Sequence, residues 1–259
     1  MAQYKIHPLQ AGEIGASLGV LAMMEDMQTV VVGPVYIFYL EGGPEKILVD
    51  AGMPASGYGG KTGGEKAVSR ALEAVGVKPE EIDTLVLTHL HFDHCAAVHL
   101  FKNARVIVQE KEWEAATDPI PAMQSVYDPS LIRAVERMNL VLADGDREIA
   151  PGVSTLLLPG HTEGLQGLSV DTRAGTYVLA GDLAYGYYNI DPTVSRITDA
   201  AGNEIELIPR PGWPFIPPGL HTSLEHWFES MRRALSIAGG DKTRIIPGHD
   251  PVLAGKILG

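Results

Sequence analysis

The chain has 259 residues, of which 45% are hydrophobic and 20% charged, and its formal net charge is −12. This length can bury one large core or two small ones, and the composition is that of an ordinary globular protein. The acidic balance argues against a nucleic-acid partner, because phosphates require a basic protein face. A single cysteine, Cys95, excludes an internal disulfide framework and favours a reducing compartment.

The sequence predicts neither export nor membrane insertion. The first residues, Met1 to Lys5, include too few apolar side chains for a signal peptide, and no stretch is long enough to span a membrane. We therefore expect a cytoplasmic protein with no nucleic-acid partner and no membrane contact. The sequence leaves a homodimer open.

Apolar, β-branched runs alternate with helical patterns along the first half of the chain. The predicted elements are a strand over residues 29–40 that Gly33 and Pro34 interrupt, its hairpin partner over 46–50, a helix over 67–75 that Gly76 ends, buried strands over 84–88 and 105–109, and a helix over 130–138. Residues 15–19 follow no apolar strand, so we expect a turn there.

The second half repeats this order. Strands are predicted over residues 153–158, 168–171 and 176–180, followed by a long helix and a short strand over 244–246. Thr222 with Glu225 three residues later is a capping box, which predicts where the long helix begins. Strands followed by helices, twice, indicate an α+β protein with two β-sheets packed face to face and helices outside. No linker-like stretch separates the halves, so residues 1–259 are predicted to form a single domain.

Residues 183–221 form a long connection that is rich in aromatic residues and prolines, with a small hairpin predicted over 194–198 and 204–208. Long loops in compact domains are usually functional lids or disordered, and the aromatic content disfavours disorder. The sequence leaves open whether this insertion only covers the sheet or also contacts substrate. We predict that it walls the substrate cleft together with residues 53–64.

A cluster of histidines and one aspartate follows the strand over residues 84–88, in the segment Thr88-His89-Leu90-His91-Phe92-Asp93-His94. His89 and His91 are two apart on an extended segment, so they project to one side and can share an ion. Asp93 and His94 follow as the chain turns into the next helix, and can face a second ion.

Three further candidates, His161, Asp182 and His249, each follow a strand and a glycine. A carboxylate such as that of Asp182 is a natural bridge between two cations. Nitrogen and oxygen ligands without a thiolate indicate zinc or a similar borderline ion. Seven such groups exceed what one tetrahedral ion uses, so we expect two divalent metal ions, zinc first and cobalt, manganese or iron as alternatives. A hydroxide held between two ions needs no serine or cysteine nucleophile.

These motifs occur in the order seen in metallo-β-lactamase-fold hydrolases, and the chain resembles that family over nearly its whole length. The shared segments also include Ile47 to Gly52, Pro159-Gly160-His161-Thr162, Gly181-Asp182 and Gly248-His249. The resemblance implies a four-layer αβ/βα sandwich with a dinuclear site on its rim. It further implies the following roles: His89, His91 and His161 hold the first metal, Asp93, His94 and His249 hold the second, Asp182 bridges, and Asp50 supports the ligands from behind.

Within the family, the chain looks most like the quorum-quenching N-acyl-homoserine lactonases. Tyr185, three residues after Asp182, matches the tyrosine that those enzymes place over the metals. The resemblance implies a small-molecule substrate, a lactone whose ring is opened by a metal-bridging hydroxide. It also implies that Tyr185 donates a hydrogen bond to the lactone carbonyl and that Asp93 carries the proton to the leaving oxygen. Two departures are the glycine-rich segment 53–64, which lacks bulky apolar residues, and the longer insertion 183–221.

Two alternatives stay open at the level of sequence. The first is a hydrolase of the same fold that acts on amides, linear esters or phosphotriesters. The second is a non-enzymatic binder that keeps the fold, because residues 55–62 fit a loose phosphate-loop pattern.

Overall fold

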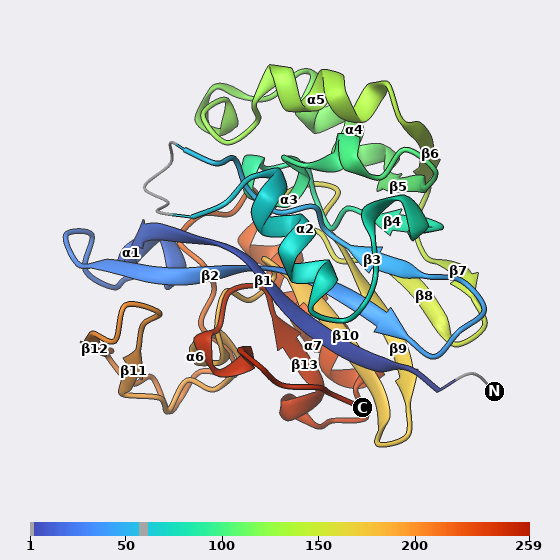
Figure 1. The fold of residues 1–259 in the computed structure, drawn as a ribbon. Helices are drawn as coiled ribbons and strands as arrows, with labels where there is room; N and C mark the ends of the chain where they lie inside the picture. The colour runs from blue at the N-terminus through green and yellow to red at the C-terminus, as the bar shows by residue number, and fades with distance from the viewer. Residues whose placement is uncertain (1–2, 57–61) are drawn as a thin grey trace.

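The computed structural model describes residues 3–56 and 62–259, and its two large β-sheets pack face to face (Figure 1). Sheet one has the strand order β1-β2-β3-β4-β5-β6. Its strands are β1 (Lys5–Ser17), β2 (Val30–Glu41), β3 (Ile47–Val49), β4 (Thr84–Val86), β5 (Arg105–Gln109) and β6 (Asn139–Ala143). The first three strands are antiparallel and the pairs from β3 to β6 are parallel, so the sheet is mixed.

Sheet two has the order β13-β10-β9-β8-β7. Its strands are β7 (Arg147–Ala150), β8 (Val153–Leu157), β9 (Gln166–Thr172), β10 (Gly175–Gly181) and β13 (Ile245–Pro247). Strands β10 and β13 run parallel and the other pairs antiparallel. Both sheets are therefore mixed, as the αβ/βα sandwich requires.

Helices cover the outer face of each sheet. The helices are α1 (Leu18–Leu21), α2 (Glu65–Glu73), α3 (Phe92–Cys95), α4 (Glu110–Thr117), α5 (Pro129–Glu136), α6 (Tyr187–Ile190) and α7 (Leu224–Ile237). Single 3₁₀ turns occupy Pro79–Glu81, Val98–Leu100, Pro121–Met123, Lys242–Arg244 and Pro251–Leu253. Helices α2, α4 and α5 pack on sheet one, and α7 packs on sheet two.

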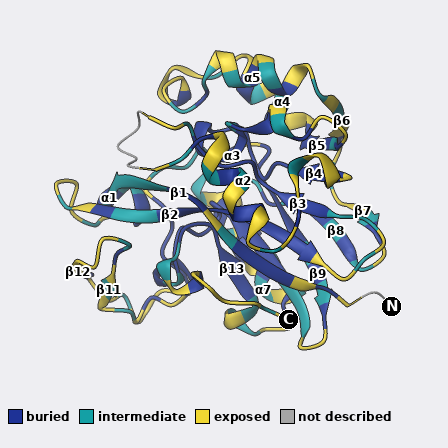
Figure 2. Cartoon of the chain, in the orientation of Figure 1, coloured by how far each residue is buried: buried dark blue, intermediate teal, exposed yellow. Residues whose placement is uncertain are grey.

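The alternation of side chains along each strand supplies the three apolar interfaces of this sandwich. In β3, Leu48 faces the helices on sheet one, whereas Ile47 and Val49 face sheet two. In β10, Leu179 faces sheet one, whereas Val178 faces α7. Strands β3, β4 and β13 are accordingly buried along their whole length, and the outer helix faces are exposed (Figure 2). The predicted four-layer αβ/βα fold is confirmed.

Three local predictions were wrong. Strand β2 continues through Gly33 and Pro34. Its neighbour β3 pairs only with Phe38–Leu40, so no strand of the described chain lies beside Pro34 on that side of β2. A proline is tolerated at such an edge, where no partner strand needs its amide hydrogen. Residues 15–17 are not a turn but the end of β1, a strand that the sequence did not predict. Helix α7 is capped by Ser223, whose hydroxyl accepts the amide of His226, while the Thr222 hydroxyl donates to the carbonyl of Gly160.

The insertion 183–221 contains helix α6 and the predicted hairpin, formed by β11 (Arg196–Thr198) and β12 (Glu204–Glu206). The hairpin lies at one end of the sandwich, below α1 in the view of Figure 1. Among the described residues, no helix is both long and apolar enough to cross a membrane.

Candidate metal centre

The seven predicted ligand residues gather at one rim of the sandwich, where they form two buried groups that could each hold a metal ion. His89, His91, Asp93 and His94 follow β4 of sheet one. The remaining three follow strands of sheet two, His161 after β8, Asp182 after β10 and His249 after β13. The strand order therefore brings together residues that are far apart in the sequence.

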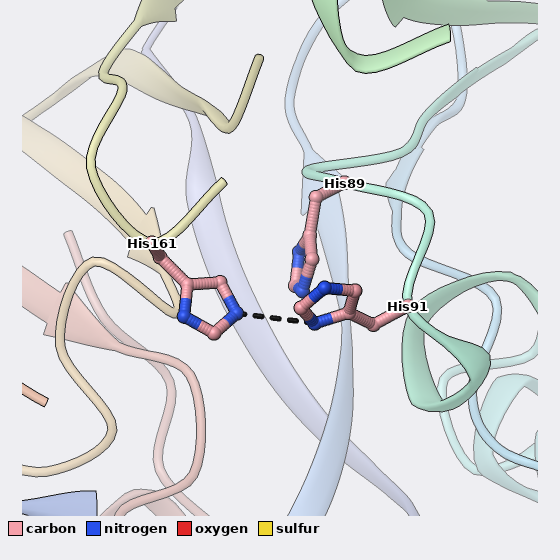
Figure 3. Close-up of side chains that lie close together, drawn as sticks. All are labelled: His89, His91 and His161. Carbon is pink, nitrogen blue, oxygen red and sulfur yellow. Dashed lines mark hydrogen bonds between the residues drawn. The ribbon is translucent and has the colours of Figure 1, made fainter. Parts of the chain in front are cut away.

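The first group consists of His89, His91 and His161. Figure 3 shows His161 approaching from one segment and the other two imidazoles from a single turn opposite it. The Nε2 atom of His161 lies 3.1 Å from Nδ1 of His91. This is close to the separation of about 3.3 Å between two nitrogens that bind one zinc ion tetrahedrally at about 2.0 Å.

The second group consists of Asp93, His94, Asp182 and His249, and Asp182 faces both groups. Its Oδ2 lies 3.8 Å from Nε2 of His89 and 3.6 Å from Nε2 of His161. Its Oδ1 lies 3.3 Å from Nε2 of His94 and 3.0 Å from Nε2 of His249. One carboxylate thus directs one oxygen to each group, which is the arrangement of a bridging ligand.

Hydrogen bonds to the ring nitrogens that face away from the centre fix the orientation of two of these imidazoles. Nδ1 of His161 donates to the carbonyl of Leu220 at 2.9 Å, and Nδ1 of His249 donates to the carbonyl of Pro34 at 2.8 Å. A neutral ring that donates through Nδ1 carries a lone pair on Nε2. In His249 the Nε2 atom lies only 3.0 Å from a carboxylate oxygen of Asp182; burial would lower the pKa of this imidazole, but the carboxylates of Asp182 and Asp93 raise it. A proton on Nε2 therefore accounts for this approach, and a cation bound between the two groups would displace it.

Asp50 supports the centre from behind, as the resemblance implied. Its carboxylate lies 2.8 Å from Nδ1 of His94 and accepts the backbone amide of Thr88 at 2.7 Å and the Thr88 hydroxyl. Because that hydroxyl donates to Asp50, it is free to accept from Nδ1 of His89 at 3.1 Å. The Nε2 atom of His89 is then directed into the centre, where it is buried without a hydrogen-bond partner among the described residues. The nitrogen and oxygen atoms of these side chains therefore fit a metal ion.

Burial and charge prepare the two groups differently. Burial lowers the pKa of His89, His91 and His161, so these rings are neutral. Burial alone would lower the pKa of His94, but the carboxylates of Asp182, Asp93 and Asp50 outweigh it and raise that pKa. Burial likewise opposes ionisation of Asp182, yet His94 and His249 hold its pKa well below the usual value. The first group thus has the neutral imidazoles that metal binding requires, whereas His94 and His249, whose pKa values are raised, would lose a proton when a cation binds the second group.

A cavity of about 350 Å³ opens onto the centre. Its polar end is formed by His91, Asp93, Asp182, Tyr185 and His249, and its apolar walls include Ile14, Ala16, Val20, Leu21, Val31 and Ile197. The ring of Tyr185 lies 5.7 Å from that of His161 and 5.6 Å from that of His249, centroid to centroid. Burial together with Asp182 and Asp93 raises the Tyr185 pKa well above its usual value, so its hydroxyl stays protonated.

The insertion lines this cavity, as predicted, through residues that include Tyr188, Ile197 and Leu220. The prediction for residues 53–64 was wrong as far as they are described. None of the described residues in that segment lines the cavity, and residues 57–61, together with most of the phosphate-loop-like pattern, lie outside the described part. The end of β1 and helix α1 take that place, and nothing in the sequence marked them as pocket residues.

Comparisons with known proteins agree with this site. Residues 30–249 match the model of the metallo-beta-lactamase superfamily. An N-acyl homoserine lactonase from a Bacillus species is 33% identical over 177 residues, which cover 62% of this chain and 68% of that protein. The N-acyl homoserine lactonase AiiB from Agrobacterium fabrum is 33% identical over 136 residues, which cover 48% of this chain and 49% of that protein.

Two solved structures are similar over nearly the whole chain. One is a quorum-quenching N-acyl homoserine lactone lactonase, with 26% identity, a TM-score of 0.78 and coverage of 98% of this chain and 95% of the other. The second is an N-acyl homoserine lactone hydrolase with the product N-hexanoyl-L-homoserine at its catalytic metal centre, with 25% identity, a TM-score of 0.77 and coverage of 97% and 95%. Since the family model spans most of the sequence and the observed sandwich carries the family's cluster of histidines and aspartates at its rim, the chain belongs to the metallo-β-lactamase superfamily.

Proposed function

We propose that this protein is a dinuclear, metal-dependent lactonase that hydrolyses lactones carrying an apolar acyl chain, of which N-acyl homoserine lactones are one class. The observation that carries the proposal is the cavity, which joins an apolar chamber to a polar end containing residues of both ligand groups. The similarity to lactonases over nearly the whole fold supports the same substrate class. We also propose that residues 1–259 act as one domain, with the insertion 183–221 as part of the cavity wall.

The proposed ligands follow from the two groups. His89, His91 and His161 would hold one cation, Asp93, His94 and His249 the other, and Asp182 would contact both. Zinc is the proposed ion, because imidazole and carboxylate without thiolate suit it, and cobalt, manganese and iron accept similar ligands. Such a cation pair supplies a nucleophilic hydroxide near neutral pH and polarises a carbonyl.

Two side chains of this chain are proposed to act on the substrate directly. The protonated hydroxyl of Tyr185 lines the cavity beside both ligand groups, where it would donate a hydrogen bond to the lactone carbonyl oxygen as negative charge develops there. The carboxylate of Asp93 lines the same end. In ring opening, a carbon–oxygen bond forms from water and the ring carbon–oxygen bond breaks, and Asp93 would pass the proton from the attacking water to the leaving oxygen.

A substrate panel tests the proposal. Metal-replete protein would be assayed with acylated lactones of several chain lengths, linear esters, cyclic amides and phosphotriesters, with zinc, cobalt and manganese in turn. We expect the largest kcat/KM for acylated lactones, because the apolar chamber contributes binding energy only when an acyl chain fills it. The variant Leu21→Asp, which places a charge in the apolar wall, should reduce kcat/KM for long acyl chains more than for unsubstituted lactones. A preference for phosphotriesters or cyclic amides would overturn the proposal.

A further inference from the structure

A buried carboxylate outside the ligand groups connects the two loops that present the first group. Glu112 of α4 is only 1% exposed. Its oxygens accept the backbone amide of Leu90 at 2.9 Å, the hydroxyl of Tyr127 at 3.0 Å and the hydroxyl of Thr162 at 2.5 Å. The backbone amide of Gly164 is a fourth donor to it. All four partners donate hydrogen bonds to Glu112, so the site suits a carboxylate, which only accepts them.

Two of these donors lie directly beside the histidines of the first group. Leu90 lies between His89 and His91, and Thr162 directly follows His161. One side chain therefore holds both loops whose imidazoles meet at 3.1 Å in the first group. The contact extends to the backbone, because a Cβ atom added to Gly164 would lie 2.0 Å from the amide nitrogen of Glu112. Only glycine permits the second loop to lie directly on α4.

Tyr127 extends the connection to the face of one imidazole. Its ring packs against His91 at a centroid distance of 4.9 Å and an interplanar angle of 67°, while its hydroxyl donates to Glu112. The adjacent residue, Val126, accepts the backbone amide of Phe92 at 3.0 Å. The ring of His91 thus packs against a residue that Glu112 itself anchors.

The second group is supported by different residues. His94 is held by Asp50, and His249 by the carbonyl of Pro34. Neither of these supports is among the hydrogen-bond partners of Glu112. A change at Glu112 should therefore affect the two groups unequally.

We propose that Glu112 is a positioning residue for the group formed by His89, His91 and His161, setting the distance between its two loops and thus the affinity for one of the two cations. The inference rests on the proposed dinuclear centre and is independent of the substrate. Glu112 neither lines the cavity nor belongs to either ligand group. It acts through Leu90, Thr162 and Tyr127.

The test measures metal binding rather than turnover. Metal-free wild type, Glu112→Gln and Glu112→Ala would be titrated with zinc in competition with a chromophoric chelator, which resolves two binding steps. Glu114→Gln, an exposed neighbour on the same helix, is the matched control. We expect Glu112→Gln to weaken one step by about 10- to 100-fold, the range for losing a partner that orients metal ligands, and to leave the other step unchanged. Glu112→Ala should weaken the same step further, and Glu114→Gln neither.

Anomalous diffraction from crystals of the variant at limiting zinc should show depletion at the histidine group and not at the group containing Asp93. Unchanged binding in both steps, equal weakening of both steps, or depletion of the second group alone would overturn the proposal. Circular dichroism and unfolding of the metal-free variants show whether each is folded. If both Glu112 variants fail to fold, Tyr127→Phe carries the same test, because it removes one donor and keeps the ring against His91.

The outcome separates the two proposals. A wild type that binds two zinc ions but hydrolyses no lactone would overturn the proposed substrate and leave this inference standing. A wild type that binds fewer than two ions would overturn the dinuclear centre, and the inference with it.

Discussion

Replacing Gly160 with alanine is expected to destabilise the fold and displace His161 at once. Gly160 has a φ of +143°, and an added Cβ would lie 2.5 Å from Cα and 2.7 Å from N of Trp227 in α7. These are backbone atoms of a fixed helix. Trp227 is fully buried and its indole nitrogen donates to the carbonyl of Leu183 at 2.8 Å. The new methyl group can be accommodated only if the loop that carries His161 moves.

The magnitude follows from two separable costs. A non-glycine residue in this backbone region costs about 1–3 kcal/mol. Inserting a methyl group into a packed contact adds about 1–3 kcal/mol. We therefore expect a loss of about 2–6 kcal/mol in the free energy of unfolding, and a Tm lower by about 2–4 °C for each kcal/mol in a chain of this length.

Urea unfolding of metal-free protein measures this loss without the contribution of bound ions. Gly76→Ala is the control, because Gly76 also has a positive φ, of +70°, but nothing within 4 Å of an added Cβ. That variant should lose only about 1–2 kcal/mol. Zinc titration should show one weakened binding step in Gly160→Ala and none in Gly76→Ala. If the two variants lose equal stability and bind zinc alike, the close approach to Trp227 is not the reason that position 160 requires glycine.

Three further outcomes are expected. Elemental analysis of metal-replete protein should find two ions per chain, with Asp182→Ala losing ions from both groups and His99→Ala losing none; one ion or fewer in the wild type would contradict the centre. Tyr185→Phe should lower kcat for lactones by about one to three powers of ten at unchanged metal content, and equal kinetics would show that the hydroxyl has no role. Arg210→Met should cost about 3–5 kcal/mol in urea unfolding, because it leaves Glu25 buried beside α1 without its cation, and Glu25→Gln in the same chain should recover much of that loss.

The cluster of candidate metal ligands was predictable because its signal is local. His89, His91, Asp93 and His94 fall within six residues, and no packing role explains that density. His161, Asp182 and His249 each follow an apolar strand and a glycine, so their position at a strand end could be read without knowing the fold. The family's motif order then supplied the pairing between them.

Other features depend on contacts that a local pattern does not contain. Strand β1 pairs only with β2 among the strands of sheet one, and it carries Gly12, Gly15 and Glu13, so its sequence resembles a loop. Its place in the cavity wall arises from pairing with β2. Glu112 looks like any acidic residue on a charged helix. Leu90 reaches it because β4 pairs with β5, and Thr162 reaches it because sheet two packs on sheet one.

The division of the ligands between the two sheets has a consequence for how long the protein survives in a cell. Each proposed cation would join a loop after β4 to loops from the second half of the chain, and so act as a reversible cross-link in a protein with one cysteine. Binding to the folded chain alone adds about 2.7 kcal/mol per site when the free ion is at about 100 times its Kd. Metal starvation would then raise the unfolded fraction and expose the chain to proteases, so that the supply of the ion governs the amount of enzyme as well as its activity.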